Sequence, residues 1–250
     1  MEKVNLFNID FDNFSFDDLS SYIKEAIYNR EPRYIVTCNV DHIIKLTKEE
    51  EFLNVYNKAD AVVADGVPVV WASKLLKKPL KQKVSGSDII PMLGKDFEKN
   101  KFKLFFLGAA EGVAEQAKKN LEIEFPGLEV VGCYSPSYGF EKNESENIEI
   151  IRMIKAANPD ILFVGVGAPK QEVWINKYYK EYNVPVSIGV GATFDFLAGN
   201  VKRAPIILQN IGLEWAWRLC QEPKRLWKRY LVDDSKFLLL LFKELKKSKA

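Results

Sequence analysis

The sequence predicts an α/β protein in which helices cover both faces of a parallel sheet, followed by a helical appendage. From residue 33 to 190, short apolar runs rich in β-favouring residues alternate with longer segments of helical periodicity. After residue 200 the strand pattern stops, and the chain becomes rich in Trp, Arg and Leu. We therefore predict a core over residues 1–200 and an appendage over residues 201–250.

The predicted strands share a nearly continuous apolar character, which is typical of strands buried on both faces. They are Arg33–Cys38, Ala61–Ala64, Lys103–Leu107, Leu128–Cys133, Ile161–Gly165 and Val184–Val190. The segments Glu111–Phe125 and Glu146–Ala157 between them have apolar residues three and four positions apart, as amphipathic helices do. Before the first strand, Ser15 indicates the N-cap of a helix that runs to about residue 29. In the appendage, Pro223 is expected to divide the helical structure into at least two helices.

The charge of the chain is unevenly distributed. The formal net charge is +2, which argues against nucleic-acid binding by the whole chain. Residues 201–250 contain twelve Lys or Arg and five Asp or Glu, a net charge of +7, which leaves −5 for residues 1–200. A basic segment on a mildly acidic body predicts docking on an anionic surface. No run approaches the roughly 20 apolar residues of a membrane span, and the N-terminus lacks a signal-peptide pattern, so we expect a cytoplasmic protein with peripheral membrane contact.

The residue types that usually hold a metal are sparse. The three cysteines are scattered without a CxxC pair, and His42 is the only histidine, so neither a disulfide framework nor a His-rich metal site is expected. Asp10-Phe11-Asp12 matches the DxD pattern with which many glycosyltransferases hold a metal and a nucleotide diphosphate. It precedes the first predicted helix instead of following a strand of the sheet. We therefore favour loop or cap carboxylates there and predict no metal.

Asp65 is a candidate because of its position directly after a predicted strand. Ligands of open parallel α/β sheets bind at the carboxyl ends of the strands. Asp65 ends an apolar run and is followed by Gly66, so its carboxylate is placed to accept a proton in a cleft. The alternative is that Asp65 caps a helix starting near Val67-Pro68, with proline early in its first turn. Spacing alone favours the cap, and both interpretations stay open.

Other strand ends also carry polar or glycine-rich sequence. Thr37 and Asn39 follow the first strand of the predicted sheet, and His42 comes just after them, where either a substrate hydrogen bond or a structural role is possible. Glycine-rich turns indicate phosphate binding by backbone amides at helix N-termini. Neither GxG turn completes a dinucleotide fingerprint, and no P-loop is present, which disfavours a nicotinamide dehydrogenase and a P-loop NTPase. The candidate substrate-binding residues at these turns are Gly108, Ala109, Gly167, Lys170, Gln171 and Gly191.

In the appendage, basic residues are interleaved with Trp and Leu. Such a pattern is typical of an interfacial helix among anionic lipid head groups. Its arginines could instead bind a diphosphate through two hydrogen bonds each, or the helix could pack on the core with a solvated basic face. The basic residues are Arg218, Lys224, Arg225, Lys228 and Arg229.

Seven sequence blocks together carry a family resemblance. They are TCNVDHII, VVADGVPVVWASKLL, KVSGSDII, FLGAA, FVGVGAPKQE, GVGATFDFLAGNVKRAP and GLEWAWRLCQEPKRLWKRYL. In this order they resemble the conserved blocks of the WecG/TagA/CpsF glycosyltransferase family (family twenty-six), over about residues 5 to 245. The resemblance implies an inverting, metal-independent transferase without a cofactor. It also implies a Rossmann-like core and an appendage that docks on the membrane and helps to close the active site.

The resemblance also implies the substrates and the roles of individual residues. The donor would be a UDP-sugar and the acceptor a polyprenyl-diphosphate-linked sugar, at the inner face of the plasma membrane. The family's catalytic Asp falls on Asp65, with its Thr and Asn on Thr37 and Asn39; Gly66 and His42 lie in the same blocks. A third family arginine falls on Lys228, beside Arg229, which is a departure from the family pattern. The remaining carried-over residues are Gln171, Arg218 and Arg225.

With the substrates that the resemblance implies, we expect Asp65 to take the proton of the acceptor hydroxyl. The charge of the leaving UDP would be stabilised by backbone amides near Gly167 or Gly191 and by Arg218 and Arg225. The blocks DGVPVVWASKLL and VSGSDII are most similar to exopolysaccharide members that transfer glucose, whereas teichoic-acid members transfer N-acetylmannosamine, so the donor stays open. The alternatives are a nucleotide-sensing, non-catalytic membrane adaptor and a sugar-nucleotide-modifying enzyme. A homo-oligomer is left open.

Overall fold

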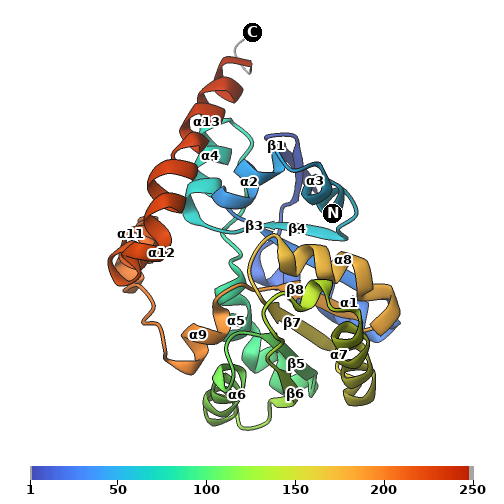
Figure 1. The fold of residues 1–250 in the computed structure, drawn as a ribbon. Coiled ribbons are helices and arrows are strands. Elements are labelled where there is room, and N and C mark those ends of the chain that lie inside the picture. The colour runs from blue at the N-terminus through green and yellow to red at the C-terminus, as the bar shows by residue number, and fades with distance from the viewer. Residues whose placement is uncertain (1, 248–250) are drawn as a thin grey trace.

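The computed structural model describes residues 2–247; Met1 and residues 248–250, at the outer ends of the predicted core and appendage, lie outside the described part. A six-stranded parallel sheet forms its centre, with the strand order β4-β3-β8-β7-β5-β6 (Figure 1). The α/β prediction and all six predicted strands are confirmed. The strands are β3 (Arg33–Cys38), β4 (Ala61–Ala64), β5 (Lys103–Gly108), β6 (Glu129–Tyr134), β7 (Ile161–Gly165) and β8 (Val186–Gly189).

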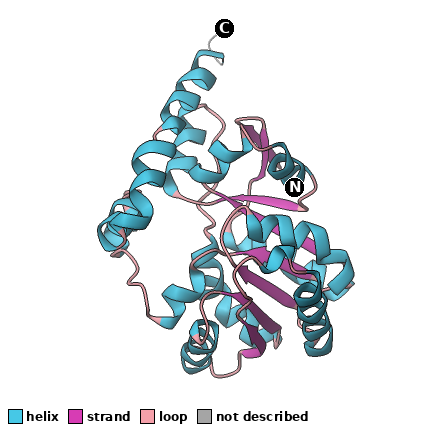
Figure 2. Ribbon diagram, in the orientation of Figure 1, coloured by secondary structure: helices cyan, strands magenta, loops and turns pink. Residues whose placement is uncertain are grey.

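Helices cover both faces of this sheet (Figure 2). The crossovers β3 to β4 and β7 to β8 run along the sheet in one direction, and β5 to β6 runs in the other, so right-handed connections place their helices on opposite faces. Two separate hydrophobic clusters result, one on each face. One face carries α2 (Val40–Leu46), α3 (Glu50–Asn57), α7 (Glu144–Ala157) and α8 (Lys170–Tyr182). The other carries α1 (Phe16–Asn29), α5 (Gly86–Asn100), α6 (Val113–Glu124) and α9 (Thr193–Ala198).

The helix α1 begins where its sequence predicts. The Ser15 hydroxyl accepts a hydrogen bond from the backbone N–H of Asp18 at 3.1 Å, and the Asp18 carboxylate accepts one from the N–H of Ser15 at 2.8 Å. This reciprocal capping box satisfies two N–H groups that a helix start otherwise leaves unpaired. The helix ends at Arg30, which has a positive φ of 55°. Two further elements, α4 (Val67–Leu75) and the 3₁₀ turn η1 (Phe140–Lys142), complete the core.

A short antiparallel hairpin precedes α1 and was not expected from the sequence. Its strands are β1 (Lys3–Leu6) and β2 (Ile9–Asp12). The Asp12 carboxylate accepts a hydrogen bond from the N–H of Val62 at 2.9 Å, so it covers the free edge of β4. Burial raises the pKa of Asp12 above its ordinary value. Asp10 accepts a hydrogen bond from the Asn5 side chain at 2.7 Å, so both carboxylates of the DxD string belong to this hairpin.

The appendage is helical and divided at Pro223, as predicted. Its elements are α10 (Ile206–Asn210), α11 (Glu214–Gln221), α12 (Pro223–Trp227), the π-helical turn η2 (Lys228–Asp233) and α13 (Lys236–Lys247). From α9 the chain runs through α10, α11 and α12, and the following elements η2 and α13 pack against α2 of the core (Figure 1). Phe237 of α13 is buried against Phe7 of the hairpin turn, with ring centroids 5.2 Å apart. Phe237 of α13 thus shares a hydrophobic cluster with residues of the core. The domain boundary at residue 200 stays a prediction. Over residues 2–247, no helix has the length and apolar character of a membrane span.

Candidate active site

Three backbone turns meet at the carboxyl ends of β5, β7 and β8. A Cβ atom on Gly108 would lie 2.5 Å from the carbonyl oxygen of Gly165, and one on Gly165 would lie 2.7 Å from the carbonyl oxygen of Gly191. Glycine is therefore required for this close approach. Ala109 adopts a φ of 62°, a conformation that is uncommon for a residue with a side chain and is often found at functional sites. After the neighbouring strands β5 and β7, the chain continues to opposite faces of the sheet. Open α/β sheets bind ligands in the crevice outside the carboxyl ends of two such strands.

Gln171 connects two of these turns. Its side-chain oxygen accepts hydrogen bonds from the N–H groups of Gly167 and Gly191, both at 3.1 Å. The residue is only 3% exposed. The amides of Gly167 and Gly191 are thus already engaged within the protein, which corrects the expectation that these two amides are free to stabilise a leaving diphosphate. The structure instead gives Gln171 the role of fixing both turns relative to each other.

Glu172 is a buried acid that sequence reasoning missed. It is completely buried, and its Oε1 accepts a hydrogen bond from the Gln171 side chain at 2.7 Å. Burial raises the pKa of Glu172 to about 7, and the Gln171 hydrogen bond opposes part of that rise. Its Oε2 has no hydrogen-bond partner within the described part of the chain. The string GAPKQE contains this residue, but its burial depends on α8 packing against the sheet, which one sequence does not reveal.

Asp65 lies at the end of β4, next to the end of β3. Its N–H donates to the carbonyl of Cys38 at 2.9 Å, and its side chain is partly buried. The N-cap of α4 is Gly66, and no side chain caps this helix, so the interpretation of Asp65 as a helix cap is wrong. Burial raises the pKa of Asp65 to about 6, while a hydrogen bond from the Ser85 hydroxyl and the charge of Lys83 lower it. Asp65 is therefore mostly ionised at neutral pH and has the carboxylate form that a general base requires.

The segment from Lys83 to Asp88 lies beside Asp65. The N–H of Val84 donates to the carbonyl of Ala64 at 2.8 Å, which places the segment against the end of β4. Lys83 and Asp88 form an ion pair at 2.8 Å. The negative charges of Asp88 and of Glu214 in α11 raise the pKa of Asp65. Sequence reasoning recognised KVSGSDII as a block but assigned none of these residues a role.

Thr37, Asn39 and His42 all have partners within the protein. The Thr37 hydroxyl donates to the carbonyl of Gly189 at 3.2 Å, and the Asn39 side chain caps α2 by accepting from the N–H of His42 at 3.1 Å. The Nδ1 atom of His42 lies 2.6 Å from the Tyr56 hydroxyl, and its ring is 3% exposed. Burial lowers the pKa of His42 to about 3, so the ring is neutral at physiological pH. These contacts support a structural role for His42 and place Thr37 and Asn39 at the strand end beside Asp65.

Two of the predicted appendage arginines are directed at α9. The Arg218 guanidinium lies over the ring of Phe196, 5.5 Å from its centroid. Burial raises the pKa of Asp195, and the charges of Arg225 and Arg218 oppose this rise, which indicates that both arginines lie near Asp195. The structure thus brings Arg218 and Arg225 toward the helix that follows the Gly191 turn.

The other predicted basic residues are placed differently. Lys228 is exposed, whereas Arg229 lies 3.6 Å from the carboxylate of Asp41 in α2. Lys170 pairs with Glu141 at 3.3 Å. Arg229 and Lys170 are therefore held by acidic partners of the same chain, and Arg225 is paired in the same way with Glu222 at 2.7 Å.

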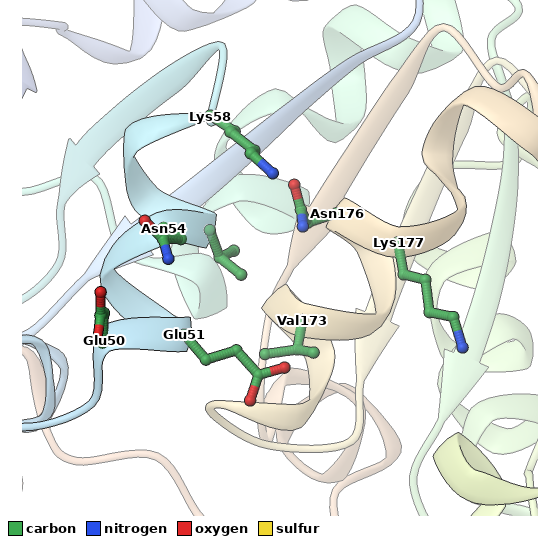
Figure 3. A pocket seen from close by; sticks show the side chains of 8 residues that line it. Glu50, Glu51, Asn54, Lys58, Val173, Asn176 and Lys177 are labelled. Carbon is green, nitrogen blue, oxygen red and sulfur yellow. The ribbon is translucent and has the colours of Figure 1, made fainter.

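A surface pocket of about 490 Å³ lies between α3 and α8 (Figure 3). Its lining has charges of both signs, with Glu50 and Glu51 on one helix and Lys177 on the other. The strand-end residues described above do not line it. This pocket is therefore separate from the candidate active site.

Taken together, the strand ends present an ionised carboxylate and three glycine turns, and two appendage arginines lie near α9, the helix that follows the third turn. A partly buried carboxylate can remove a proton from a hydroxyl group, and arginines can neutralise a phosphate leaving group. This combination suits transfer of a group from a phosphorylated donor to an alcohol.

Comparison with known proteins gives matches over nearly the whole chain. A sequence model described as the Glycosyl transferase WecG/TagA/CpsF family matches residues 4–250. An N-acetylglucosaminyldiphosphoundecaprenol N-acetyl-beta-D-mannosaminyltransferase of Bacillus spizizenii is 34% identical over 223 residues, which covers 88% of this chain and 84% of that protein. A protein of the same name from Staphylococcus aureus is 33% identical over 226 residues, covering 90% and 87% of the two chains.

Proposed function

Because the chain belongs to the WecG/TagA/CpsF family of glycosyltransferases, we propose that it moves a sugar from a UDP-sugar onto a polyprenyl-diphosphate-linked sugar, with inversion at the anomeric carbon. The observation that carries this proposal is Asp65, a partly buried, ionised carboxylate at the strand ends. The relatives are named as enzymes that act on a sugar-diphospho-undecaprenol acceptor. A non-catalytic adaptor or a sugar-nucleotide-modifying enzyme is accordingly not favoured.

In the proposed reaction, Asp65 accepts the proton of the acceptor hydroxyl. The hydroxyl oxygen forms a bond to the anomeric carbon while the bond from that carbon to the diphosphate oxygen breaks, and UDP leaves with the electron pair. With a pKa of about 6, Asp65 is roughly ten times more often ionised than protonated at pH 7. General-base help of this kind contributes about 10²- to 10⁴-fold to a rate.

Departure of UDP requires positive charge near the diphosphate. Arg218 and Arg225 supply it in this proposal, since Arg218 lies over Phe196 of α9 and both arginines lie near Asp195 of the same helix. Arg225 would exchange its present partner, Glu222 at 2.7 Å, for the diphosphate. Gln171 keeps the turns at Gly167 and Gly191 in place around the donor. We propose that no metal takes part, because Asp10 and Asp12 are engaged in the hairpin.

The appendage is proposed to dock on the anionic inner face of the plasma membrane, where the lipid-linked acceptor resides. In α13, Leu238, Leu239 and Phe242 are 59%, 64% and 63% exposed, although Phe237 on the same helix is buried. Lys243 and Lys246 extend the same helix and are exposed. Exposed leucine and phenylalanine beside lysine is the arrangement of helices that lie in the membrane interface.

The proposed base is tested by Asp65→Asn, with Asp17→Asn in the exposed first turn of α1 as the matched control. Release of UDP is measured with a short-chain lipid-diphosphate N-acetylglucosamine acceptor. We expect Asp65→Asn to lower turnover by about 10²-fold or more while leaving UDP-sugar binding intact. Turnover close to that of the unsubstituted protein would exclude Asp65 as the base.

The donor is proposed to be UDP-N-acetylmannosamine, because the similar proteins are named N-acetylmannosaminyltransferases. The same assay with UDP-glucose and UDP-N-acetylglucosamine tests this choice. Preferential use of UDP-glucose would instead favour the exopolysaccharide alternative.

The proposed independence of metal is tested in the same assay with EDTA. Unaltered turnover in EDTA is the expected result for a metal-independent reaction.

A further inference from the structure

Arg203 lies in the linker between α9 and α10 and has contacts on both the core and the appendage. Its guanidinium donates to the Ser87 hydroxyl at 3.2 Å and to the Ser87 carbonyl at 3.4 Å, and it forms an ion pair with Asp88. On its other side, Nε lies 3.6 Å from the carboxylate of Glu214 in α11. The side chain is only 24% exposed. One arginine therefore bridges the first turn of α5 and the first turn of an appendage helix.

A chain of hydroxyl groups continues from Arg203 to the proposed base. The Ser87 hydroxyl lies 3.1 Å from the Ser85 hydroxyl. Ser85 follows Val84, whose N–H donates to the carbonyl of Ala64 beside Asp65 at 2.8 Å, and Ser85 lowers the pKa of the Asp65 carboxylate. Arg203 is thus two side chains away from Asp65.

The backbone next to Arg203 is fixed to α11 (Glu214–Gln221). The carbonyl of Lys202 accepts hydrogen bonds from the Trp217 indole at 3.1 Å and from the Gln221 side chain at 2.9 Å. Because these contacts join the linker to α11, a displacement of α11 from the core carries Arg203 with it. The position of the appendage is thereby linked to the hydrogen bonds that reach the carboxyl end of β4.

We propose that Arg203 is a positioning residue that couples docking of the appendage to the orientation of the Asp65 carboxylate. The proposal rests on the proposed function, in which Asp65 is the base. When α11 is docked, Arg203 holds Ser87 and Asp88, and Ser85 donates to Asp65. When α11 is displaced, this support is lost and the carboxylate is no longer held toward the acceptor.

The charges around Asp65 provide a test that a purely structural role would not pass. Lys83 attracts the Asp65 carboxylate, whereas Asp88 and Glu214 repel it. Arg203 lies between the two repelling acids and neutralises them. Removing the charge of Arg203 should therefore raise the pKa of Asp65, and removing that of Glu214 should lower it.

The experiment compares Arg203→Gln, Arg203→Lys and Glu214→Gln in the full chain with phosphatidylglycerol-containing vesicles. The matched control is Arg152→Gln, since Arg152 pairs with Glu149 on the exposed surface of α7. We expect Arg203→Gln to lower kcat at pH 7 by about tenfold with the donor KM within about threefold, and Arg203→Lys to restore part of kcat. The midpoint of the rising limb of kcat/KM against pH should move up by about half a unit in Arg203→Gln and down in Glu214→Gln.

A fourth variant covers the case in which Arg203→Gln does not fold. Ser87→Ala keeps the ion pair between Arg203 and Asp88 but interrupts the hydroxyl chain, so it should also lower kcat while its thermal unfolding stays like that of the unsubstituted protein. A wild-type kcat and an unmoved pH midpoint in Arg203→Gln would overturn the proposal. So would a loss of activity by the same factor at every pH with the midpoint of the pH profile unmoved.

Comparison with Asp65→Asn separates this proposal from the one on which it rests. If Asp65→Asn is active, the proposed base is wrong, whatever Arg203 does. If Asp65→Asn is inactive and the Arg203 variants behave like Arg152→Gln, only the coupling proposed for Arg203 is refuted.

Discussion

The hydrogen bond from Ser85 to Asp65 should set the pH range in which the enzyme works. Burial raises the pKa of Asp65 to about 6, and Ser85 is the largest of the influences that lower it. Ser85→Ala removes this donor from the carboxylate, so the ionised form loses stabilisation and the pKa rises. One pKa unit corresponds to about 1.4 kcal/mol, and a hydrogen bond to a charged group contributes about 1.5–3 kcal/mol. Because water can replace part of the lost bond, we expect a rise of about one unit, to roughly pH 7.

This rise has a definite signature in the pH profile. The base is active when ionised, so activity is lost as the pH falls through the pKa of Asp65. At pH 6.5, a shift from about 6 to about 7 lowers the ionised fraction roughly threefold, whereas at pH 8.5 the two proteins should differ by less than about 10% from this cause. The measurement is kcat/KM for UDP release between pH 5 and pH 9, with Ser145→Ala on the exposed start of α7 as control.

Two outcomes would refute this reasoning. In one, the Ser85→Ala profile coincides with that of the unsubstituted protein. In the other, activity falls by the same factor at every pH, which would show that Ser85 supports the fold of the site without influencing the ionisation of Asp65.

Two other predictions concern Glu172 and the membrane. Burial raises the pKa of Glu172 to about 7 in the folded state, so the folded state binds the extra proton and stability falls as the pH rises from about 4.5 to 7. At pH 8, Glu172→Gln should therefore be more stable than the unsubstituted protein by about 2–3 kcal/mol at most, measured by urea unfolding. At pH 4.5 the two proteins should have similar stability. Equal stability at both pH values would contradict this prediction. The double substitution Leu239→Ser with Phe242→Ser should weaken binding to anionic vesicles, measured by sedimentation, by about tenfold or more. Because both side chains are exposed, thermal unfolding should not change. The control Ile148→Ser, which replaces an exposed side chain of α7, should leave vesicle binding unchanged. Vesicle binding that survives the double substitution would place the docking surface elsewhere.

The sheet could be predicted because its strands have strong local signals. Buried parallel strands such as Ile161–Gly165 are apolar throughout, and their ends are marked by glycine or proline. The helix after Ser15 has a capping box within four residues of sequence. In contrast, β1 and β2 are only four residues each. Their apolar residues alternate with polar ones, but over so short a stretch that sequence reasoning did not recognise two strands, and the hydrogen bond from Val62 to Asp12 joins positions fifty residues apart.

The candidate site was predictable in part for the same reason. Asp65 follows β4 directly, and Gln171 lies in the first turn of α8, six residues after the end of β7, so topology alone places both at the carboxyl edge of the sheet. Spacing favoured a cap for Asp65, but the structure shows Gly66 at the N-cap of α4 and leaves the Asp65 carboxylate facing Ser85. The error arose because a residue one position before a helix cap has the same local sequence as the cap itself. Only the location of Ser85, twenty positions later, distinguishes the two.

The environment of Asp65 is built from segments that lie far apart in the chain, and this has a mechanistic consequence. Ser85 and Lys83 come from the loop before α5, and Glu214 belongs to the appendage. If the base were controlled by core residues alone, displacing the appendage would change access to the site but not the orientation of Asp65. Displacement of α11 removes both Glu214, which repels the carboxylate, and Arg203, which offsets that repulsion, so the pKa of Asp65 should change little while the support provided through Arg203 is lost. An undocked enzyme would thus have an ionised but poorly oriented base, so membrane docking should act on kcat more than on donor binding.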